Sequence, residues 1–193
     1  LADGEHAVAM ICVKTDEMAK KGDFLFITKN GQVKRTAAAE YGIRRAKFSA
    51  INLKGEDELV GMVQVDPDDK DDIVLITQTG MALRFKLDTV SCTGRATAGV
   101  RGIDVAKNDA VRWFEIPKAG TMLFVVSDRG FGKRMLCDDI ERQGRAGKGQ
   151  KLLPMNKTGE TGQMLAACLN VTEAKAVRVE QKHGHVTTLD VGE

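Results

Sequence analysis

Residues 25–37 read LFITKNGQVKRTA: an apolar, β-branched run, a short polar turn that ends in Gly31, and a second run beyond it. This order is typical of a β-hairpin, because glycine adopts turn conformations that other residues adopt only with strain. Three further stretches align with it: VLITQTGMALRFK from Val74, LFVVSDRGFGKRM from Leu123, and VRVEQKHGHVTTL from Val177. The sequence therefore predicts four hairpins.

The turn glycines of these hairpins recur at a nearly constant period. They are Gly31, Gly80, Gly130 and Gly184, with spacings of 49, 50 and 54 residues. A period of about 40 to 50 residues in β-rich sequence is typical of propeller blades, which repeat one small sheet around an axis. A small β-sandwich is the competing architecture, but it requires no fixed period.

Two more β-type runs accompany the hairpins. One precedes each hairpin: AVAMICV from Ala7, LVGMVQV from Leu59, AVRWFEI from Ala110 and MLAACLNV from Met164. Another follows a basic loop after the hairpin: FSAINL from Phe48, GVRGIDV from Gly99 and GQKLLPM from Gly149. We therefore predict a single all-β, propeller-like domain over residues 1–193, with about four four-stranded blades in units of about 5–54, 55–106, 107–156 and 157–193. The fourth unit ends before its last strand.

The charge balance limits the functions that this domain can have. Lys and Arg number 29 against 27 Asp and Glu, a net charge of +2, which argues against a uniformly basic protein of the histone kind. A nucleic-acid surface would need segregated charge, and the acidic run from Asp66 to Asp72 is consistent with that. No apolar run approaches the ~18 residues of a membrane helix, so we expect no membrane partner and a cytoplasmic location. Because residue 1 is Leu, we expect a fragment of a longer chain.

Basic residues recur with the repeat at two places. The first is the position four residues after the turn glycine, with the position before it, and the second is the loop before each final strand. The residues are Lys34, Arg35, Arg84, Lys133 and Arg134 at the first place, and Arg44, Arg45, Lys47, Arg95, Arg101, Arg142, Arg145 and Lys148 at the second. On successive blades these charges should form a curved stripe, which suits the phosphate backbone of a nucleic acid.

The stripe admits other interpretations. Exposed basic loops can simply keep a β-protein in solution, and the pattern does not distinguish DNA, RNA or an acidic protein as the ligand. Aromatic residues make up only 5% of the chain, which gives little support for stacking on single strands, so duplex DNA is the better target. The alternative function is a propeller-like protein-interaction module that binds an acidic partner.

Chemistry-bearing patterns are absent from the sequence. The three histidines have no plausible catalytic partners, and the four cysteines show neither zinc-ligand spacing nor a disulfide framework. The acidic residues sit mostly in turns, without the convergent carboxylates of a hydrolase. We therefore expect no catalytic, metal-binding or cofactor-binding residues and no enzyme activity from this chain alone.

The segments GDFLFITKNGQVKRT, INLKGEDELVGM, GRATAGVRGI and FGKRM resemble the C-terminal domain of the bacterial DNA gyrase A protein and of its paralogue in topoisomerase IV. The resemblance covers essentially the whole chain. It implies a β-pinwheel, a propeller-like disc whose blades exchange strands and whose basic perimeter wraps duplex DNA. In gyrase, this wrapping supports ATP-dependent negative supercoiling.

The same resemblance implies where the remaining functions lie. ATP and Mg²⁺ would belong to the partner subunit or to the rest of the enzyme, and a gyrase B-type subunit would be a partner through the rest of the parent chain. The location would be the bacterial cytoplasm, with the nucleoid. The segment QGRAGKG, residues 143–149, resembles the signature heptapeptide of gyrase but lies in the third unit and departs from it at Gly144 and Ala146. The assignment to gyrase or to topoisomerase IV stays open, and the segments GVRGIDV and QGRAGKG favour gyrase.

Overall fold

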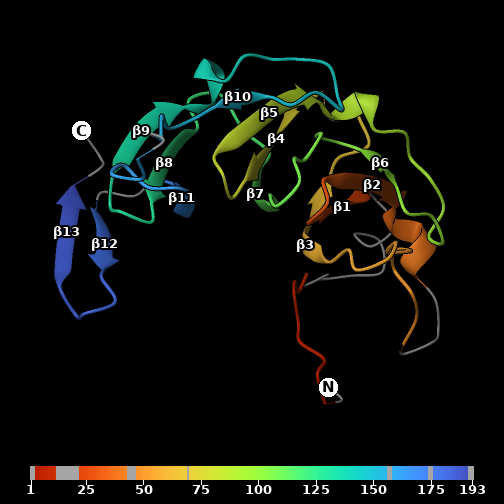
Figure 1. The fold of residues 1–193 in the computed structure, drawn as a ribbon. Helices are drawn as coiled ribbons and strands as arrows, with labels where there is room; N and C mark the ends of the chain where they lie inside the picture. Colours follow the sequence, from red (N-terminus) through yellow and green to blue (C-terminus); the bar gives the residue numbers. More distant parts are fainter. Residues whose placement is uncertain are drawn as a thin grey trace.

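The chain forms an arc of four small β-sheets in the computed structural model, which describes residues 3–11, 22–42, 47–68, 70–155, 158–173 and 176–190 (Figure 1). Short 3-10 turns follow the first three hairpins: η1 (Ala38–Tyr41), η2 (Leu87–Thr89) and η3 (Cys137–Asp139). Within the described ranges there is no helix long and apolar enough to cross a membrane. The all-β prediction is confirmed.

All four predicted hairpins are present. They are β1 (Asp23–Thr28) with β2 (Gln32–Ala37), β4 (Asp72–Thr77) with β5 (Met81–Lys86), β8 (Met122–Ser127) with β9 (Gly132–Leu136), and β12 (Ala176–Glu180) with β13 (Val186–Asp190). Each turn glycine has a positive φ, from 78° at Gly31 to 84° at Gly130. Only glycine adopts this conformation readily, which is why the glycine spacing reveals the repeat.

The remaining strands connect neighbouring units. They are β3 (Leu59–Val65), β6 (Val100–Arg101), β7 (Val111–Glu115), β10 (Gln150–Lys151) and β11 (Leu165–Asn170). The sheets are ordered β3-β1-β2-β6, β10-β5-β4-β7, β11-β8-β9 and β12-β13. Thus β3 pairs with the hairpin that precedes it, and β6 crosses back from the second unit to complete the first sheet.

This pairing corrects the grouping of strands into blades. A sequence unit of about fifty residues is not a blade, since the run before each of the second and third hairpins, and the run from Met164, join the sheet of the previous unit. The runs from Ala7 and Phe48 are not strands in their described parts. The equivalent later runs pair with the preceding hairpin, and the described residues before β1 include no hairpin. Only the first two sheets have four strands among the described residues.

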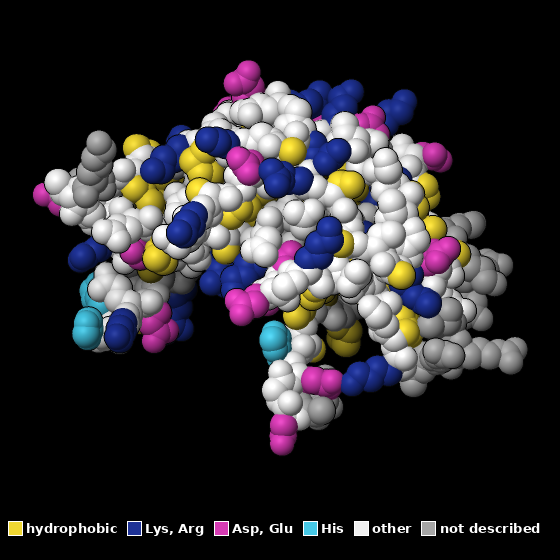
Figure 2. Space-filling view, turned by 45° about the vertical axis from the view of Figure 1, so that its right-hand side comes forward, with side chains coloured by type: hydrophobic (Ala, Val, Ile, Leu, Met, Phe, Trp, Pro, Cys, Tyr) yellow, Lys and Arg dark blue, Asp and Glu magenta, His cyan; other side chains and the backbone are white. Residues whose placement is uncertain are grey.

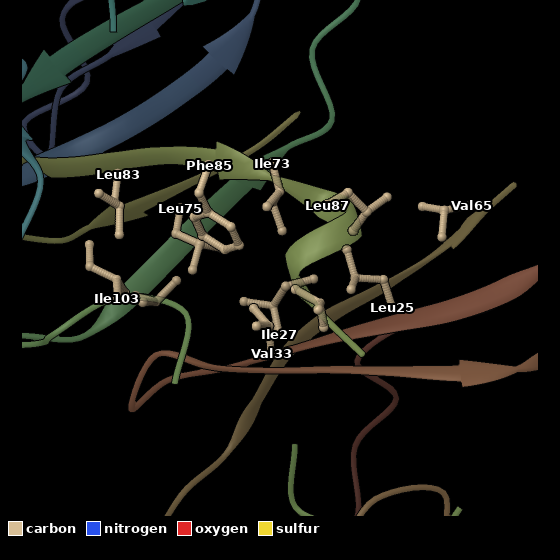
Figure 3. Close-up of a cluster of buried hydrophobic side chains, with 12 residues drawn as sticks. Leu25, Ile27, Val33, Val65, Ile73, Leu75, Leu83, Phe85, Leu87 and Ile103 are labelled. Carbon is tan, nitrogen blue, oxygen red and sulfur yellow. The ribbon is translucent and has the colours of Figure 1, made fainter. Parts of the chain in front are cut away.

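The core lies between successive sheets, because the central strands are buried on both faces. One cluster joins the first two sheets and includes Leu25, Ile27, Val33, Ile73, Leu75, Leu83 and Phe85 (Figure 3). The alternate residues of β4, Val74 and Ile76, belong to the next cluster, between the second and third sheets. Successive side chains of a strand point to opposite faces, so β4 contributes to two cores and fixes the order of the sheets along the arc.

Candidate nucleic-acid interface

Arg35 and Arg84, four residues after their turn glycines, lie in buried ion pairs. Arg35 Nε lies 2.5 Å from Asp23 Oδ2, with about 8% of the Arg35 side chain exposed. Arg84 Nε lies 2.6 Å from Asp72 Oδ2, with 14% of the Arg84 side chain exposed. The aspartate is the first residue of the strand that pairs with the arginine's strand, and the two residues are diagonal neighbours on one sheet face.

These pairs correct the first half of the predicted stripe. Arg35 also donates to the carbonyl O of Pro67, and Arg84 lies 2.8 Å from Asp138 and donates to the carbonyl O of Cys137. Lys34 is 1% exposed, and its Nζ donates to Tyr41 Oη and to the carbonyl O atoms of Ala50 and Arg95. Guanidinium and ammonium groups that are already buried and bonded cannot reach a phosphate, so Lys34, Arg35 and Arg84 hold the sheets together and leave the candidate DNA-contacting set.

The third unit departs from this arrangement. Lys133 and Arg134 lie on β9 and are exposed. The strand position that holds Asp72 in the second sheet is occupied in the third by Met122. Met122 carries no carboxylate, so it cannot pair with Arg134 as Asp72 pairs with Arg84. Lys133 and Arg134 are exposed and stay in the candidate set.

The basic loops reach back onto the preceding sheet. Cys92 forms an isolated β-bridge with Arg35, and Arg142 forms one with Arg84. The next residue of each loop, Thr93 or Gln143, donates its N–H to the carbonyl O of the same arginine at 2.8 Å. Each loop then passes a glycine of positive φ, Gly99 or Gly149, at which an added Cβ would overlap a backbone carbonyl of the sheet below. Glycine at these positions therefore lets the loop lie directly on the sheet. Arg44 and Arg45 lie outside the described residues.

Consecutive loops also contact one another. Arg145 Nη1 donates to the carbonyl O of Arg101 at 2.5 Å, and the Ala146 N–H donates to the carbonyl O of Gly102 at 2.7 Å. Earlier along the arc, the Asn52 N–H donates to the carbonyl O of Thr97 at 3.1 Å. The loops therefore form a continuous chain across the first three units. Figure 2 shows Lys and Arg side chains along the upper rim of the molecule, with acidic side chains among them.

The cationic ends on this chain of loops differ in exposure. Arg101 is 60% exposed beside Asp104, Arg142 is 51% exposed while it donates to Asp72, and Lys148 is exposed. Lys47 is exposed but pairs with Glu5, and Arg95 and Arg145 are half-buried.

The sequence reasoning missed Lys151. It is exposed in β10, at the position that Arg101 occupies in β6. The repeat alignment itself could have identified it, because the two strands fall fifty residues apart.

The acidic run does not act as one patch. Asp66 and Asp68 are exposed, whereas Asp72 is buried between Arg84 and Arg142. Asp71 pairs with Lys118. Within the parts of the chain that the structure describes, no group of three or more His, Cys, Asp or Glu side chains is placed to hold a metal ion.

A family model described as the DNA gyrase C-terminal domain, beta-propeller, matches residues 22–66, 71–118 and 121–162. The DNA gyrase A protein of Deinococcus deserti is 41% identical over 150 residues, which is 75% of this chain and 18% of that protein. The DNA gyrase A protein of Chlamydia trachomatis is 31% identical over 191 residues, 97% of this chain and 22% of that protein. The DNA topoisomerase 4 A protein of Bacillus subtilis is 33% identical over 162 residues, 78% of this chain and 20% of that protein. The chain thus spans about a fifth of the length of these relatives.

Solved structures match the arc of sheets. The crystal structure of the C-terminal domain of DNA topoisomerase IV superposes with a TM-score of 0.79 at 27% identity, covering 90% of this chain and 53% of that one. The DNA gyrase A C-terminal domain superposes with a TM-score of 0.69 at 21% identity, covering 90% and 57%, and supports the fold alone. The strands that the following unit contributes to each sheet, the repeat and these matches agree. The chain therefore belongs to the DNA gyrase C-terminal domain family and has the β-pinwheel fold.

Proposed function

We propose that this chain binds the backbone of duplex DNA along its basic loops and bends the duplex, as the DNA-wrapping part of a bacterial type IIA topoisomerase. The observation that carries the proposal is the continuity of the loops. Backbone hydrogen bonds join the loops of the second and third units to the sheets below, and further hydrogen bonds join consecutive loops, while Arg101, Arg142 and Lys148 keep exposed cationic ends.

The proposed contacts are to phosphate and not to bases. The set is Lys47, Arg101, Lys133, Arg134, Arg142, Lys148 and Lys151, with Arg95 and Arg145 contributing from half-buried positions. Such cations release condensed counterions from DNA and bind without reading sequence. Bending 20 to 30 base pairs by 40 to 90° costs roughly 1 to 6 kcal/mol, so contacts on several sheets at once are needed to offset it.

The relatives support the wider assignment. They are named as subunits of DNA gyrase and of DNA topoisomerase 4, so the parent of this chain is proposed to be an isomerase that changes DNA topology, with gyrase as the first choice. In that enzyme the wrapped DNA would support supercoiling, with ATP and Mg²⁺ used by the rest of the enzyme and its B-type subunit. We place it in the bacterial cytoplasm, on the nucleoid.

Charge neutralisation in the loops tests the proposal. Changing Arg101, Lys148 and Lys151 together to Gln should weaken binding of a mixed-sequence duplex of about 30 base pairs. The slope of log K against log salt is negative, and each lost phosphate contact reduces its magnitude by about 0.9. The slope of the triple variant should therefore be shallower by about 2.7. Fluorescence anisotropy between 50 and 200 mM salt measures the slope, and FRET between the duplex ends measures the bend.

The matched control neutralises three exposed lysines outside the loops, Lys54, Lys107 and Lys182. Both triples change the net charge equally, so a loss confined to the loop triple identifies the surface and not the total charge. Equal losses in the two triples, or an affinity for DNA that does not depend on salt, would overturn the proposal.

A further inference from the structure

Asp72, at the start of β4, holds two arginines with one carboxylate oxygen. Its Oδ2 lies 2.6 Å from Arg84 Nε, 2.9 Å from Arg142 Nε and 2.8 Å from Arg142 Nη2. The Asp72 side chain is 3% exposed, whereas 51% of the Arg142 side chain is exposed. A buried carboxylate therefore holds a side chain that reaches the surface of the protein.

Arg142 is held by its main chain as well. It forms a β-bridge with Arg84, and the N–H of the next residue, Gln143, donates to the carbonyl O of Arg84 at 2.8 Å. A guanidinium is planar and carries five N–H donors in fixed directions. Because one edge of the Arg142 group, with Nε and Nη2, lies against Asp72, the fold sets the direction of the whole plane.

The remaining donors of this guanidinium are available to a ligand. They are the two N–H groups of Nη1 and the N–H of Nη2 that points away from Asp72, and within the parts of the chain that the structure describes they have no protein acceptor. One donor from each of the two nitrogens forms a fork that matches two oxygens of a phosphate. Arg142 thus presents a fork of fixed direction.

The first sheet shows that the fold does not require this second arginine. There Asp23 pairs with Arg35, and Cys92 occupies the bridge position that Arg142 occupies over the second sheet. The carboxylate at the start of the strand thus binds the arginine of the neighbouring strand without an arginine from the loop. Arg142 is therefore an addition to the structural pair.

Other exposed cations of the loops are held less firmly. Arg101 Nη1 lies 3.4 Å from Asp104 Oδ1, and the two side chains are 60% and 42% exposed. Lys148 is exposed and carries its charge on a flexible stem of four carbons. Exposed ion pairs contribute little and are screened by salt, so these side chains become immobile only when a ligand binds. The Arg142 side chain is already immobile in the folded protein.

We propose that Asp72 is a positioning residue for the DNA surface: it orients the Arg142 guanidinium so that the fork binds a phosphate without further ordering. This role rests on the proposed function. Ordering one long side chain on binding lowers affinity roughly two- to tenfold, and Arg142 avoids that loss. Counterion release depends on charge and not on orientation. Orientation therefore contributes to affinity without changing the salt dependence.

Arg142→Lys tests the fork, because lysine keeps the positive charge but replaces the planar group by a single nitrogen. Affinity for a mixed-sequence duplex should fall roughly two- to tenfold, while the slope of log K against log salt stays the same. Arg178→Lys is the matched control: it makes the same change in an exposed pair with Glu180, outside the loops, and should change neither quantity. Wild-type affinity in Arg142→Lys would overturn the proposal.

A double-mutant cycle separates orientation from charge. By charge alone, Asp72→Asn should strengthen DNA binding, because it removes a negative charge close to the phosphates. The proposal predicts weaker binding, and it predicts that Arg142→Lys has no further effect once Asp72 is Asn. Trp113 fluorescence checks that each variant is folded during the titration. An equal effect of Arg142→Lys with and without Asp72 would show that Asp72 does not orient the fork.

Nuclear magnetic resonance of the whole chain tests the orientation without DNA. The Arg142 Nε–H donates to a buried carboxylate, so it should exchange with solvent about tenfold more slowly than the Nε–H of Arg178, whose side chain is 67% exposed. Equal exchange rates would overturn the proposal, even if Asp72→Asn fails to fold. Absence of DNA binding in every variant would refute the proposed function, while the exchange rates would still decide whether Asp72 holds Arg142.

Discussion

Asp72 joins the second and third units through one buried carboxylate. Its Oδ2 lies 2.6 Å from Arg84 Nε, 2.9 Å from Arg142 Nε and 2.8 Å from Arg142 Nη2, and the Asp72 side chain is 3% exposed. Asp72→Asn keeps the size of the side chain but removes its charge. Two guanidinium groups would then face each other across a neutral amide, and the third unit's basic loop would lose its anchor at Arg142.

The cost follows from burial. Removing one partner of a buried ion pair costs about 3 to 5 kcal/mol, because the remaining charge stays buried without a counter-ion. About half of the Arg142 side chain is exposed, so water compensates part of that cost, and we expect a loss of about 3 kcal/mol in the free energy of unfolding. For a chain of this length the midpoint of thermal unfolding should fall by roughly 6 to 12 °C.

Trp113 provides the assay. It is the single tryptophan and pairs with Ile76 of β4, the strand that Asp72 begins, so its fluorescence in urea titrations reports on this sheet. The control is Asp138→Asn, which removes the other carboxylate near Arg84; because Asp138 is 57% exposed, the loss should be about 1 kcal/mol or less. If the two variants lose equal stability, the Asp72 bridge is not the anchor described here.

Three other outcomes follow from the geometry. Gly149→Ala should detach β10 from β5 and lower the urea midpoint, because its Cβ would overlap a backbone carbonyl at a φ of 76°, while Gly144→Ala, with open space around it, should not. Burial raises the pKa of Cys137 from 9.0 to about 12. The unfolded thiol therefore ionises first, and stability should fall as pH rises from about 9 to 12, with a smaller slope in Cys137→Ala when urea unfolding is compared at pH 8.5 and 10. Arg35→Glu should unfold the first sheet, because it places two carboxylates together in a buried site, and circular dichroism should show the loss of β-structure. A native-like spectrum together with lost DNA binding would contradict the structural role of Arg35.

The hairpins were predictable because their signal is local. A glycine of positive φ between two apolar runs determines the turn within a few residues, as at Gly31 and Gly80. The exchange of strands was not predictable from residues alone, since β6 and β10 are two residues long and show no periodicity. Only the resemblance to a known family implied it.

The candidate DNA-contacting residues were predicted less well, for a reason that the sequence contains. Arg84 and Arg134 occupy the same repeat position, yet the Arg84 side chain is only 14% exposed while Arg134 is exposed. The difference lies twelve residues earlier, where Asp72 stands in one unit and Met122 in the next. The residue that faces an arginine across the turn therefore indicates whether that arginine is buried against a carboxylate or exposed.

The strands that pair with the sheet of the previous unit also affect when each sheet can be completed during synthesis. The outer edge of β2, which ends at Ala37, is paired only when β6 has been made, roughly 60 residues later, or about 3 to 13 s at common elongation rates of about 5 to 20 residues per second. An unpaired strand edge is a template for another chain. Neighbouring nascent chains on one messenger RNA expose such edges at the same time. Slow translation between residues 38 and 99 therefore favours pairing between these chains over completion of the sheet within one chain.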